Sequence, residues 1–292
     1  MNPDHGQDIQ GMLPEKDIDR RDFIWSALGA SAALALSQSA SGQTVVTDAK
    51  GIVGADVSIP TATGKLRGYR AMPDKDGPFP VALVAAEVFG LNPYMKDVCR
   101  RLAKVGYYAI VPDLYTRKAD LTTYSNIADI IPVVNAKYDT ELISDYDATV
   151  EFARASGNAD IARMAITGFC RGGRTTLVYA AANPKLKAAA AWYGSVGGNV
   201  SEPMPRTAMD RVAEIKVPTL GLYGAKDAGI PMDQVEKFFA ALKAAGTPAE
   251  FVIYPESGHG FHADFRSADY RKLDAEDAWS RMLAWFRKYG AV

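Results

Sequence analysis

Cys170 has the sequence context of a nucleophile. It lies in the hexapeptide Gly168-Phe169-Cys170-Arg171-Gly172-Gly173, between an apolar run (164–167) and a helix-forming run (175–181). A strand, a turn with small residues around a nucleophile and then a helix describe a nucleophile elbow. The turn strains the backbone of the nucleophile, and small flanking residues let strand and helix approach closely. The start of the helix favours the thiolate form of cysteine. The alternative is a glycine-rich turn around a buried, inert cysteine.

An acid and a base follow Cys170 in the chain, each after a predicted strand. The sequence holds three histidines, and His5 lies in the N-terminal tail, so a catalytic histidine must be His259 or His262. Flanking glycines favour His259, with His262 as the alternative base. Asp227 can orient the imidazole, although an aspartate there could also be a turn residue or a helix cap. The order Cys170, Asp227, His259 is typical of α/β-hydrolases.

Two further elements of a hydrolytic site are predicted beside the elbow. The carboxylate of Glu87 ends an apolar strand, where it can face the cleft and accept the thiol proton; an exposed strand-end glutamate is the alternative. The backbone N–H groups of Arg171 and Val88 are the predicted oxyanion hole. A metal site built from His259, His262 and Asp264 lacks the helical spacing and further ligands that such sites use. We therefore expect no metal site there.

Composition narrows the function classes. The formal net charge of −1 in 292 residues gives no general attraction to nucleic acid or anionic lipid. Two cysteines, Cys99 and Cys170, make no disulfide framework. Cys99 is expected about 10 Å along its helix from the elbow, which is too far for a bridge to Cys170.

Apolar strands alternate with helical patterns through most of the chain. This alternation predicts an α/β fold with a mostly parallel central sheet and helices on both faces. Residues 118–137 are weakly patterned and are expected to be a loop with short helices. Residues 195–207 are rich in Gly, Ser and Pro, which leaves open whether they form a lid. The last helix is expected around Glu276–Lys288. The predicted strands are 56–60, 65–72, 80–86, 107–111, 164–167, 188–194, 219–224 and 250–254.

Residues 1–42 are predicted to be a tail and an export signal, and 43–292 a single catalytic domain. Arg20-Arg21 precedes a short, mild apolar stretch (23–36) that is too short and too rich in Ala and Ser for a comfortable membrane span. This pattern resembles a twin-arginine signal. It predicts the twin-arginine export machinery as a partner, a periplasmic location and no stable membrane span in the mature form. An amphipathic helix docked on the domain is the alternative.

Five motifs together resemble the dienelactone hydrolase (carboxymethylenebutenolidase) family. The resemblance covers about residues 55–290. It implies an α/β-hydrolase fold, a Cys–His–Asp triad and opening of a lactone or activated ester without metal or cofactor. It also implies that Glu87 controls the ionisation of Cys170. The motifs are 87–92 (EVFGLN), 112–117 (PDLYTR), 168–173 (GFCRGG), 223–227 (YGAKD) and 258–261 (GHGF).

The same resemblance predicts the substrate-binding residues. Arg117 matches the family's carboxylate-binding arginine, and Tyr115 and Tyr193 are expected beside it. The family's second arginine falls on Ala263, so Arg266, three residues further on, is the nearest replacement. The expected partner is a small, acidic lactone or ester. Two alternatives are a broader carboxylesterase, in which Arg117 makes a structural ion pair, and a catalytically silent binding protein.

Overall fold

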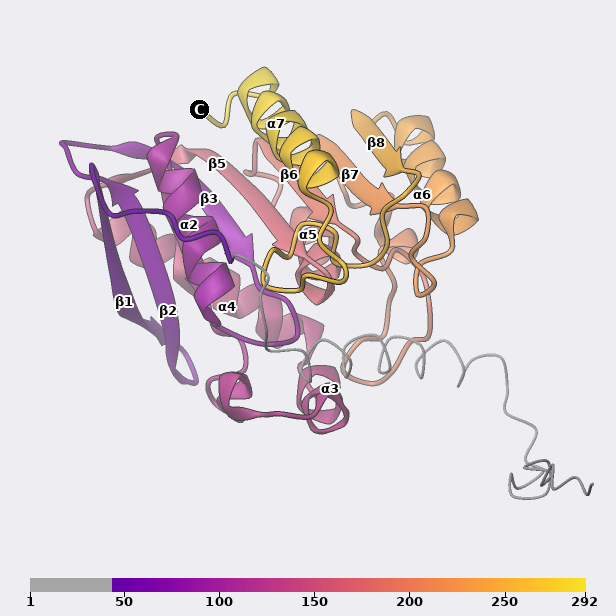
Figure 1. Ribbon diagram of the computed structural model, residues 1–292, viewed down its shortest axis with the longest axis horizontal. Coiled ribbons are helices and arrows are strands. Elements are labelled where there is room, and N and C mark those ends of the chain that lie inside the picture. The colour runs from indigo at the N-terminus through magenta and orange to yellow at the C-terminus, as the bar shows by residue number, and fades with distance from the viewer. Residues whose placement is uncertain (1–43) are drawn as a thin grey trace, which may run out of the picture.

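The computed structural model describes residues 44–292, and within them one eight-stranded sheet runs through the molecule (Figure 1). The predicted export signal therefore lies outside the described residues. The strand order is β1-β2-β4-β3-β5-β6-β7-β8. Strand β2 is antiparallel to both of its neighbours, and all the other pairs of adjacent strands are parallel. The strands are β1 (Ile52–Thr61), β2 (Gly64–Pro73), β3 (Phe79–Ala85), β4 (Tyr108–Pro112), β5 (Ala159–Phe169), β6 (Ala188–Trp192), β7 (Thr219–Gly224) and β8 (Ala249–Tyr254).

Helices cover both faces of this sheet, which confirms the predicted fold class. α2 and α7 lie in front of the sheet in Figure 1, whereas α4 and α5 lie behind it. The α-helices are α2 (Pro93–Lys104), α3 (Ile127–Asn135), α4 (Asp139–Ala155), α5 (Arg171–Ala182), α6 (Met232–Ala244) and α7 (Lys272–Lys288), with 3₁₀ turns at Leu121–Thr123 and Met209–Arg211.

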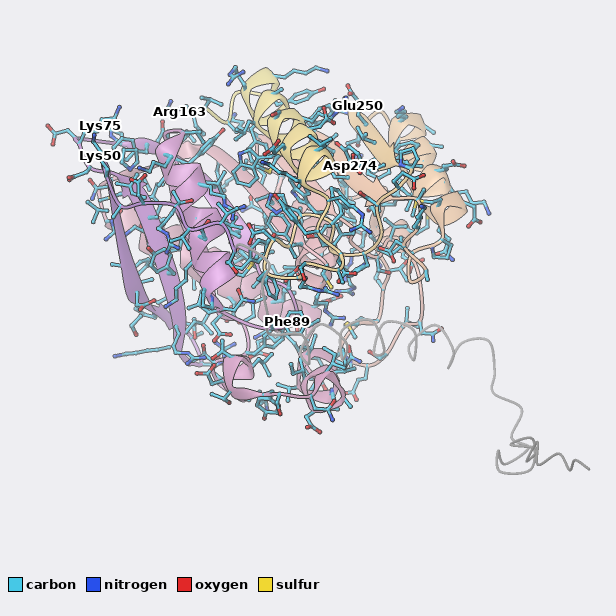
Figure 2. The ribbon with its side chains drawn as sticks, viewed as in Figure 1. Lys50, Lys75, Phe89, Arg163, Glu250 and Asp274 are labelled. Atoms are coloured by element: carbon cyan, nitrogen blue, oxygen red, sulfur yellow. The ribbon has the colours of Figure 1, made fainter. Side chains whose placement is uncertain are left out.

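The core lies between the sheet and these helices, with charged side chains around it. Strands β3, β4, β6 and β7 are buried along their whole length, as the continuous apolar runs predict. Exposed charged residues such as Lys50, Lys75 and Glu250 lie at the rim of the molecule (Figure 2). None of the helices in residues 44–292 is long and apolar enough to cross a bilayer.

Three elements begin four or five residues earlier than the sequence predicts. Strand β1 begins at Ile52 and not at residue 56, because Ile52 and Ile59 are its only buried residues and leave no apolar run to detect. Helix α7 begins at Lys272, a turn earlier than expected. None of its first three residues is buried, so this turn lacks the apolar spacing by which a helix is predicted. Strand β5 begins at Ala159, before the apolar run. Its pairing with β3 is interrupted between Pro80 and Val81, and its first five residues are half-buried or exposed.

The sheet changes winding direction between β3 and β5. The chain leaves β3 for β4 on one side, and then returns through α4 to place β5 on the other side of β3. Ligands of doubly wound sheets bind outside the carboxyl ends of the strands at such a point. Glu87 follows β3 and Cys170 follows β5, so the topology brings these two residues side by side.

Close backbone approach between β3, β5 and α5 explains the glycines of the elbow. A Cβ atom on Gly172 would lie 2.0 Å from the backbone oxygen of Ala85, and one on Gly168 would lie 2.2 Å from the oxygen of Gly172. The neighbours in both cases are backbone atoms, which cannot turn aside as a flexible side chain could. The first turn of α5 can therefore lie against β3 only without side chains at these positions.

We expect Gly172→Ala to destabilise the protein by at least about 3 kcal/mol, because the added methyl group must displace the β3 backbone. Gly51→Ala is the matched control: Gly51 has φ +72° and a Cβ there would meet nothing within 4 Å, so only the left-handed backbone costs energy, about 1–2 kcal/mol. Urea unfolding of both variants measures the difference. Equal losses would contradict the steric explanation.

Candidate active site

The backbone of Cys170 is strained at the junction of β5 and α5. Its φ of 57° and ψ of −118° lie in a region that non-glycine residues rarely adopt. Its N–H donates to the carbonyl oxygen of Trp192 on β6 at 3.0 Å, which holds the turn in place. Such strain concentrates at functional sites. Both cysteines are free: Cys99 is buried, whereas Cys170 is partly exposed at the start of α5.

His259 and Asp227 form a hydrogen-bonded pair beyond the ends of β8 and β7. Nδ1 of His259 lies 2.7 Å from Oδ2 of Asp227, and the other oxygen, Oδ1, accepts the N–H of Gly229 at 2.9 Å. The Asp227 side chain is fully buried, so its charge is poorly screened by solvent. The aspartate is therefore positioned to fix the ring orientation of His259 and to stabilise its protonated form.

The protonation of His259 depends on both neighbours. Burial by itself lowers the pKa of His259, but Cys170 and Asp227 together raise it well above its usual value. The Nε2 atom of His259 is buried and has no hydrogen-bond partner among residues 44–292. The site thus favours a protonated imidazole on His259, beside Cys170.

Glu87 is a buried carboxyl group without a hydrogen bond. Its exposed fraction is 0%, and neither carboxylate oxygen has a partner in the described part of the chain. Burial raises the pKa of Glu87 to about 7, although the charges of Arg266 and His259 oppose the rise. A group with this pKa can both accept and release a proton at neutral pH.

Tyr193, the residue after β6, packs against His259. It has a φ of 36°, its ring meets that of His259 edge-on at 5.1 Å, and its buried hydroxyl lacks a partner among residues 44–292. Unpartnered buried atoms of Glu87, Tyr193, His259 and Arg266 thus gather around Cys170. Buried polar groups are normally hydrogen-bonded, and each exception needs an explanation; ligand binding is one.

His262 occupies a supporting position that the sequence did not reveal. Its ring stacks on Phe169 and Trp279, and Nδ1 lies 2.6 Å from the Tyr94 hydroxyl. Burial lowers the pKa of His262 well below its usual value, so the ring is neutral and shares a hydrogen bond with the Tyr94 hydroxyl. Asp227 pairs with His259 and not with His262. Tyr94 has no distinguishing sequence signal, since it lies in the first turn of an ordinary amphipathic helix.

The predicted oxyanion donors flank the nucleophile. Val88 follows Glu87 in the loop after β3, and Arg171 is the first residue of α5. Among the loop and cap hydrogen bonds of residues 44–292, neither backbone N–H is a donor. The first N–H groups of a helix also lack partners within the helix. Both groups are therefore available to an oxyanion.

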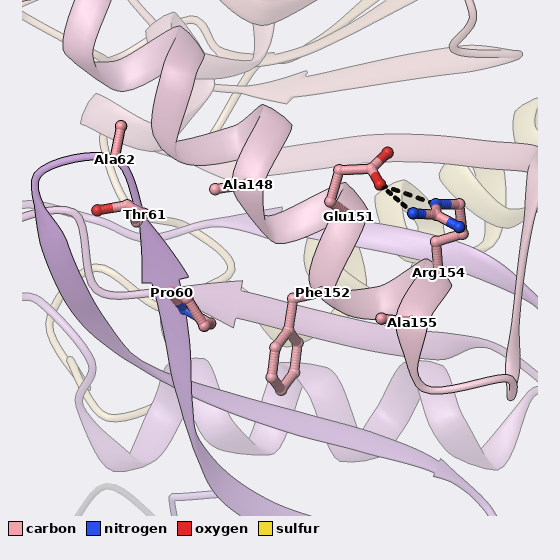
Figure 3. A pocket seen from close by; sticks show the side chains of 8 residues that line it. All are labelled: Pro60, Thr61, Ala62, Ala148, Glu151, Phe152, Arg154 and Ala155. Carbon is pink, nitrogen blue, oxygen red and sulfur yellow. Dashed lines mark hydrogen bonds and ion pairs between the residues drawn. The ribbon is translucent and has the colours of Figure 1, made fainter.

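A surface pocket elsewhere contains none of these residues (Figure 3). The end of β1 and the C-terminal half of α4 form it, and its ion pair, Glu151–Arg154, is largely exposed. It lacks a nucleophile and a buried base, so we assign the chemistry to the elbow. In residues 44–292 there is no group of three or more His, Cys, Asp or Glu residues that could hold a metal ion.

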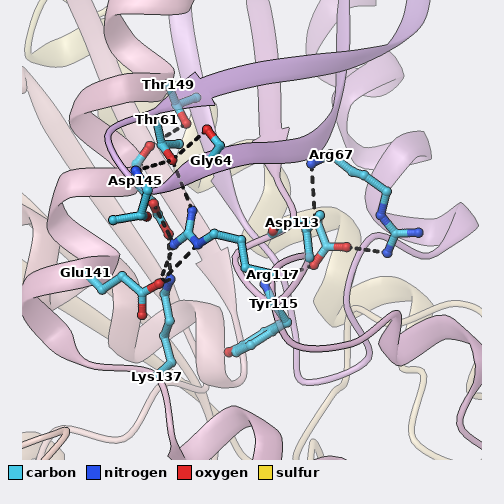
Figure 4. A network of polar contacts seen from close by, with 12 residues as sticks. Thr61, Gly64, Arg67, Asp113, Tyr115, Arg117, Lys137, Glu141, Asp145 and Thr149 are labelled. Atoms are coloured by element: carbon cyan, nitrogen blue, oxygen red, sulfur yellow. Dashed lines mark hydrogen bonds and ion pairs between the residues drawn. The ribbon is translucent and has the colours of Figure 1, made fainter.

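Arg117 already has carboxylate partners (Figure 4). Its guanidinium points toward α4, where Nη2 lies 2.8 Å from Oδ2 of Asp145 and Nε donates to Glu141 at 3.2 Å. Lys137 joins the same two carboxylates. The predicted role of Arg117 in holding a substrate carboxylate stays a prediction. The geometry favours the alternative, in which Arg117 makes a structural ion pair.

Arg266 lies against the loop that carries His259. A Cβ on Gly260 would lie 3.0 Å from its Nη1, and its Nη2 pairs with Asp269 at 2.7 Å. The side chain is 4% exposed, and its charge opposes the rise of the Glu87 pKa. Arg266 thus belongs electrostatically to the site, whereas Ala263 is buried and uncharged.

Tyr115 and the 195–207 loop both lie near Arg171. Tyr115 is buried after β4, near both Cys170 and Arg171. The loop is tied to α4 and α5: Pro203 accepts the N–H of Asp139 at 2.9 Å, and Arg206 accepts a bond from Arg174 at 3.2 Å.

A strained cysteine after the fifth strand, an acid after the seventh and a histidine after the eighth define an α/β-hydrolase. A model of the dienelactone hydrolase family matches residues 66–290. A Methylorubrum extorquens protein named "Putative carboxymethylenebutenolidase" is 46% identical over 98% of both chains. An Escherichia coli protein of the same name is 43% identical over 84% of this chain and 91% of its own.

A solved structure agrees with these relatives. The crystal structure of a Klebsiella pneumoniae protein named "Putative Dienelactone Hydrolase" has 45% sequence identity and a TM-score of 0.78, and covers 82% of this chain and 99% of its own. The chain therefore belongs to the dienelactone hydrolase family, as its motifs indicate. It is a hydrolase of the lactone and ester type.

Replacing Glu87 by Gln should change how stability depends on pH. Because the Glu87 pKa rises from 4.5 to about 7 on folding, the folded state binds the proton more tightly and stability falls as pH rises through this window. Glu87→Gln removes that loss, so its stability relative to wild type should increase by about 2.5 kcal/mol between pH 5 and pH 8.

Chemical unfolding of both proteins at the two pH values measures this difference. Glu236→Gln, an exposed glutamate on α6, is the matched control. A Glu87→Gln stability difference that stays constant from pH 5 to pH 8 would show that Glu87 is ionised in the folded protein throughout.

Proposed function

We propose that the protein opens a lactone or cleaves an activated ester through a Cys170–His259–Asp227 triad. The observation that carries the proposal is the strained Cys170 at the start of α5, beside a His259 whose pKa Cys170 and Asp227 raise against the effect of burial. A thiolate–imidazolium pair supplies a nucleophile and a proton donor together. Glu87, with its pKa of about 7, can take the proton from the Cys170 thiol.

In the proposed reaction, Sγ of Cys170 attacks the carbonyl carbon and the C=O electron pair moves onto oxygen. The backbone N–H groups of Arg171 and Val88 donate to this oxyanion. When it collapses, the bond to the ring or ester oxygen breaks, and that oxygen takes the proton from Nε2 of His259. The product is a thioester on Cys170.

Water completes the cycle. His259 accepts a proton from the water that attacks the thioester carbonyl, and Cys170 leaves as a thiolate. Asp227 keeps Nδ1 of His259 protonated through both steps. Within this proposal, Arg117 is a structural ion-pair residue that ties the loop after β4 to α4.

Mutation of the nucleophile tests this mechanism. We expect Cys170→Ala in the full-length protein to lose at least about 10³-fold in kcat on a carboxymethylenebutenolide and on a p-nitrophenyl ester. Cys99→Ala is the matched control and should keep its activity, because Cys99 is buried in α2 and burial raises its pKa.

Iodoacetamide at pH 7 should accordingly modify Cys170 and leave Cys99 intact, as read by mass spectrometry. If Cys170→Ala keeps the wild-type rate, the triad is wrong. If the wild type cleaves only the neutral ester, the broader carboxylesterase is the better description. If it cleaves neither substrate, the silent binding protein is favoured.

We also propose that the chain is exported by the twin-arginine machinery to the periplasm. The support is the sequence: Arg20-Arg21, the apolar stretch 23–36 and the small polar residues after it. Replacing both arginines by Lys should keep at least about nine-tenths of the protein in the cytoplasm on cell fractionation. Replacing Arg67 and Arg70 by Lys instead is the control. Unchanged periplasmic amounts in the Arg20/Arg21 variant would contradict export by this route.

A further inference from the structure

We propose that the Arg171 side chain, with the Tyr115 hydroxyl beside it, binds a carboxylate of the substrate next to Cys170. The inference rests on the proposed hydrolysis at Cys170 and specifies which substrates the site selects. Arg171 then has two separate roles: its backbone N–H faces the oxyanion, and its guanidinium faces an anionic group elsewhere on the substrate.

Arg171 has no carboxylate partner within ion-pair distance in residues 44–292. Its contacts are weak and uncharged: Nη1 donates to Oδ1 of Asn135 and Nη2 to the carbonyl oxygen of Val134, each at 3.4 Å. On the third side Nη2 lies 2.6 Å from the sulfur of Met204 in the 195–207 loop, and a thioether sulfur is a weak, uncharged acceptor. Charge-assisted hydrogen bonds are usually about 2.7–2.9 Å long, so these bonds leave the guanidinium poorly satisfied.

The other arginines around the site already have carboxylate partners. Asp139, the nearby acid, accepts two hydrogen bonds from Arg174 at 2.7 and 2.9 Å and one from Arg211 at 2.9 Å. Arg117 is held by Glu141 and Asp145, and Arg266 by Asp269. Among these arginines, Arg171 therefore stands out as having no carboxylate partner in residues 44–292.

An uncompensated, partly buried guanidinium favours an incoming anion. Burial lowers the pKa of Arg171, which shows that its surroundings disfavour the charge, yet an arginine stays protonated in proteins. A substrate carboxylate removes this penalty, and its two oxygens match the planar fork of N–H donors. A neutral substrate of the same shape leaves the penalty in place.

The guanidinium of Arg171 lies close to the place where the substrate must bind. Arg171 directly follows the nucleophile, at the positive end of α5. Burial raises the pKa of the Tyr115 hydroxyl; the charge of Arg171 opposes this rise, and Cys170 adds to it. Nucleophile, hydroxyl and cation thus form one cluster, which fits a short acyl group with a carboxylate a few bonds from the reacting carbonyl.

A purely structural role for Arg171 gives a different expectation. Val134 and Asn135 are the last residues of α3, and an arginine there can stabilise the end of the helix. Loss of that contact would lower stability and would affect anionic and neutral substrates alike. The ratio of the two kcat/KM values separates the roles, because losses common to both substrates cancel.

The test uses the full-length protein and two esters with one leaving group: p-nitrophenyl pentanoate and mono-p-nitrophenyl glutarate, in which a carboxylate replaces the terminal methyl. We expect the wild type to prefer the glutarate. Arg171→Gln should lower the glutarate-to-pentanoate ratio of kcat/KM by about 10–100-fold, mainly through the KM for glutarate. Tyr115→Phe should lower it by about 3–10-fold.

Two arginine controls accompany these variants. Arg154→Gln makes the same change at an exposed position, and Arg117→Gln removes the cation that is already paired. Both should keep the wild-type ratio. Arg171→Lys keeps the charge but loses the fork, so its ratio should lie between those of wild type and Arg171→Gln. If Arg171→Gln does not fold, the ratios of Arg171→Lys and Tyr115→Phe test the inference in its place.

The outcomes are distinguishable. If the ratio is unchanged in the Arg171 variants while Cys170→Ala is inactive, the inference is overturned and the proposed hydrolysis stands. If Arg117→Gln abolishes the preference instead, the carboxylate binds there and the inference is again overturned. If neither ester shows Cys170-dependent turnover, the proposed function fails, and the inference fails with it.

Discussion

The rest of the site depends on one steric constraint, the close backbone contact that holds Cys170 at φ 57°. Gly172 lies against the end of β3, and Gly173 lies against the end of β6, where a Cβ would meet the Trp192 oxygen at 2.6 Å. Because the turn is fixed on both sides, the thiol and the N-terminus of α5 point to the same edge of the sheet. Three other residues of the site reach that edge, each after a separate strand: Asp227, His259 and Glu87. The sheet therefore sets the distances between them, and no local sequence motif is required.

Several of the buried polar groups that lack partners belong to this site. The buried oxygens of Glu87, the hydroxyl of Tyr193 and Nε2 of His259 have no hydrogen bond in residues 44–292. Each such group costs free energy on folding, and the cost is tolerated where a ligand can satisfy the group. The aromatic rings beneath, with neutral His262 bound to Tyr94, exclude water and hold these groups in fixed positions. The core supports the chemistry by supplying a rigid surface of low polarity.

The sequence predicted those parts of the site that depend on strand ends. Cys170, Asp227, His259 and Glu87 each follow an apolar strand, and parallel strands present their carboxyl ends together, so their meeting followed from order alone. Side-chain pairing over long separations was not predictable. Arg117 pairs with Glu141 and Asp145, 24 and 28 residues away, because α4 crosses behind β1 and β5, and nothing in the 112–117 motif encodes that crossing. The first residues of α7 and β5 were not predicted, because their side chains are half-buried or exposed and give no apolar pattern.

The arginines show why a motif can identify a family and still leave the selecting residue open. A guanidinium already bound by two carboxylates gains little from a third, since the new anion must compete with its partners and is repelled by them. Arg117 is in that position, whereas Arg171 has only uncharged acceptors. Selection for an anion therefore belongs to the residue whose charge the fold leaves unbalanced. Such a residue can differ between members of one family while the nucleophile elbow, which rests on backbone contacts, stays the same.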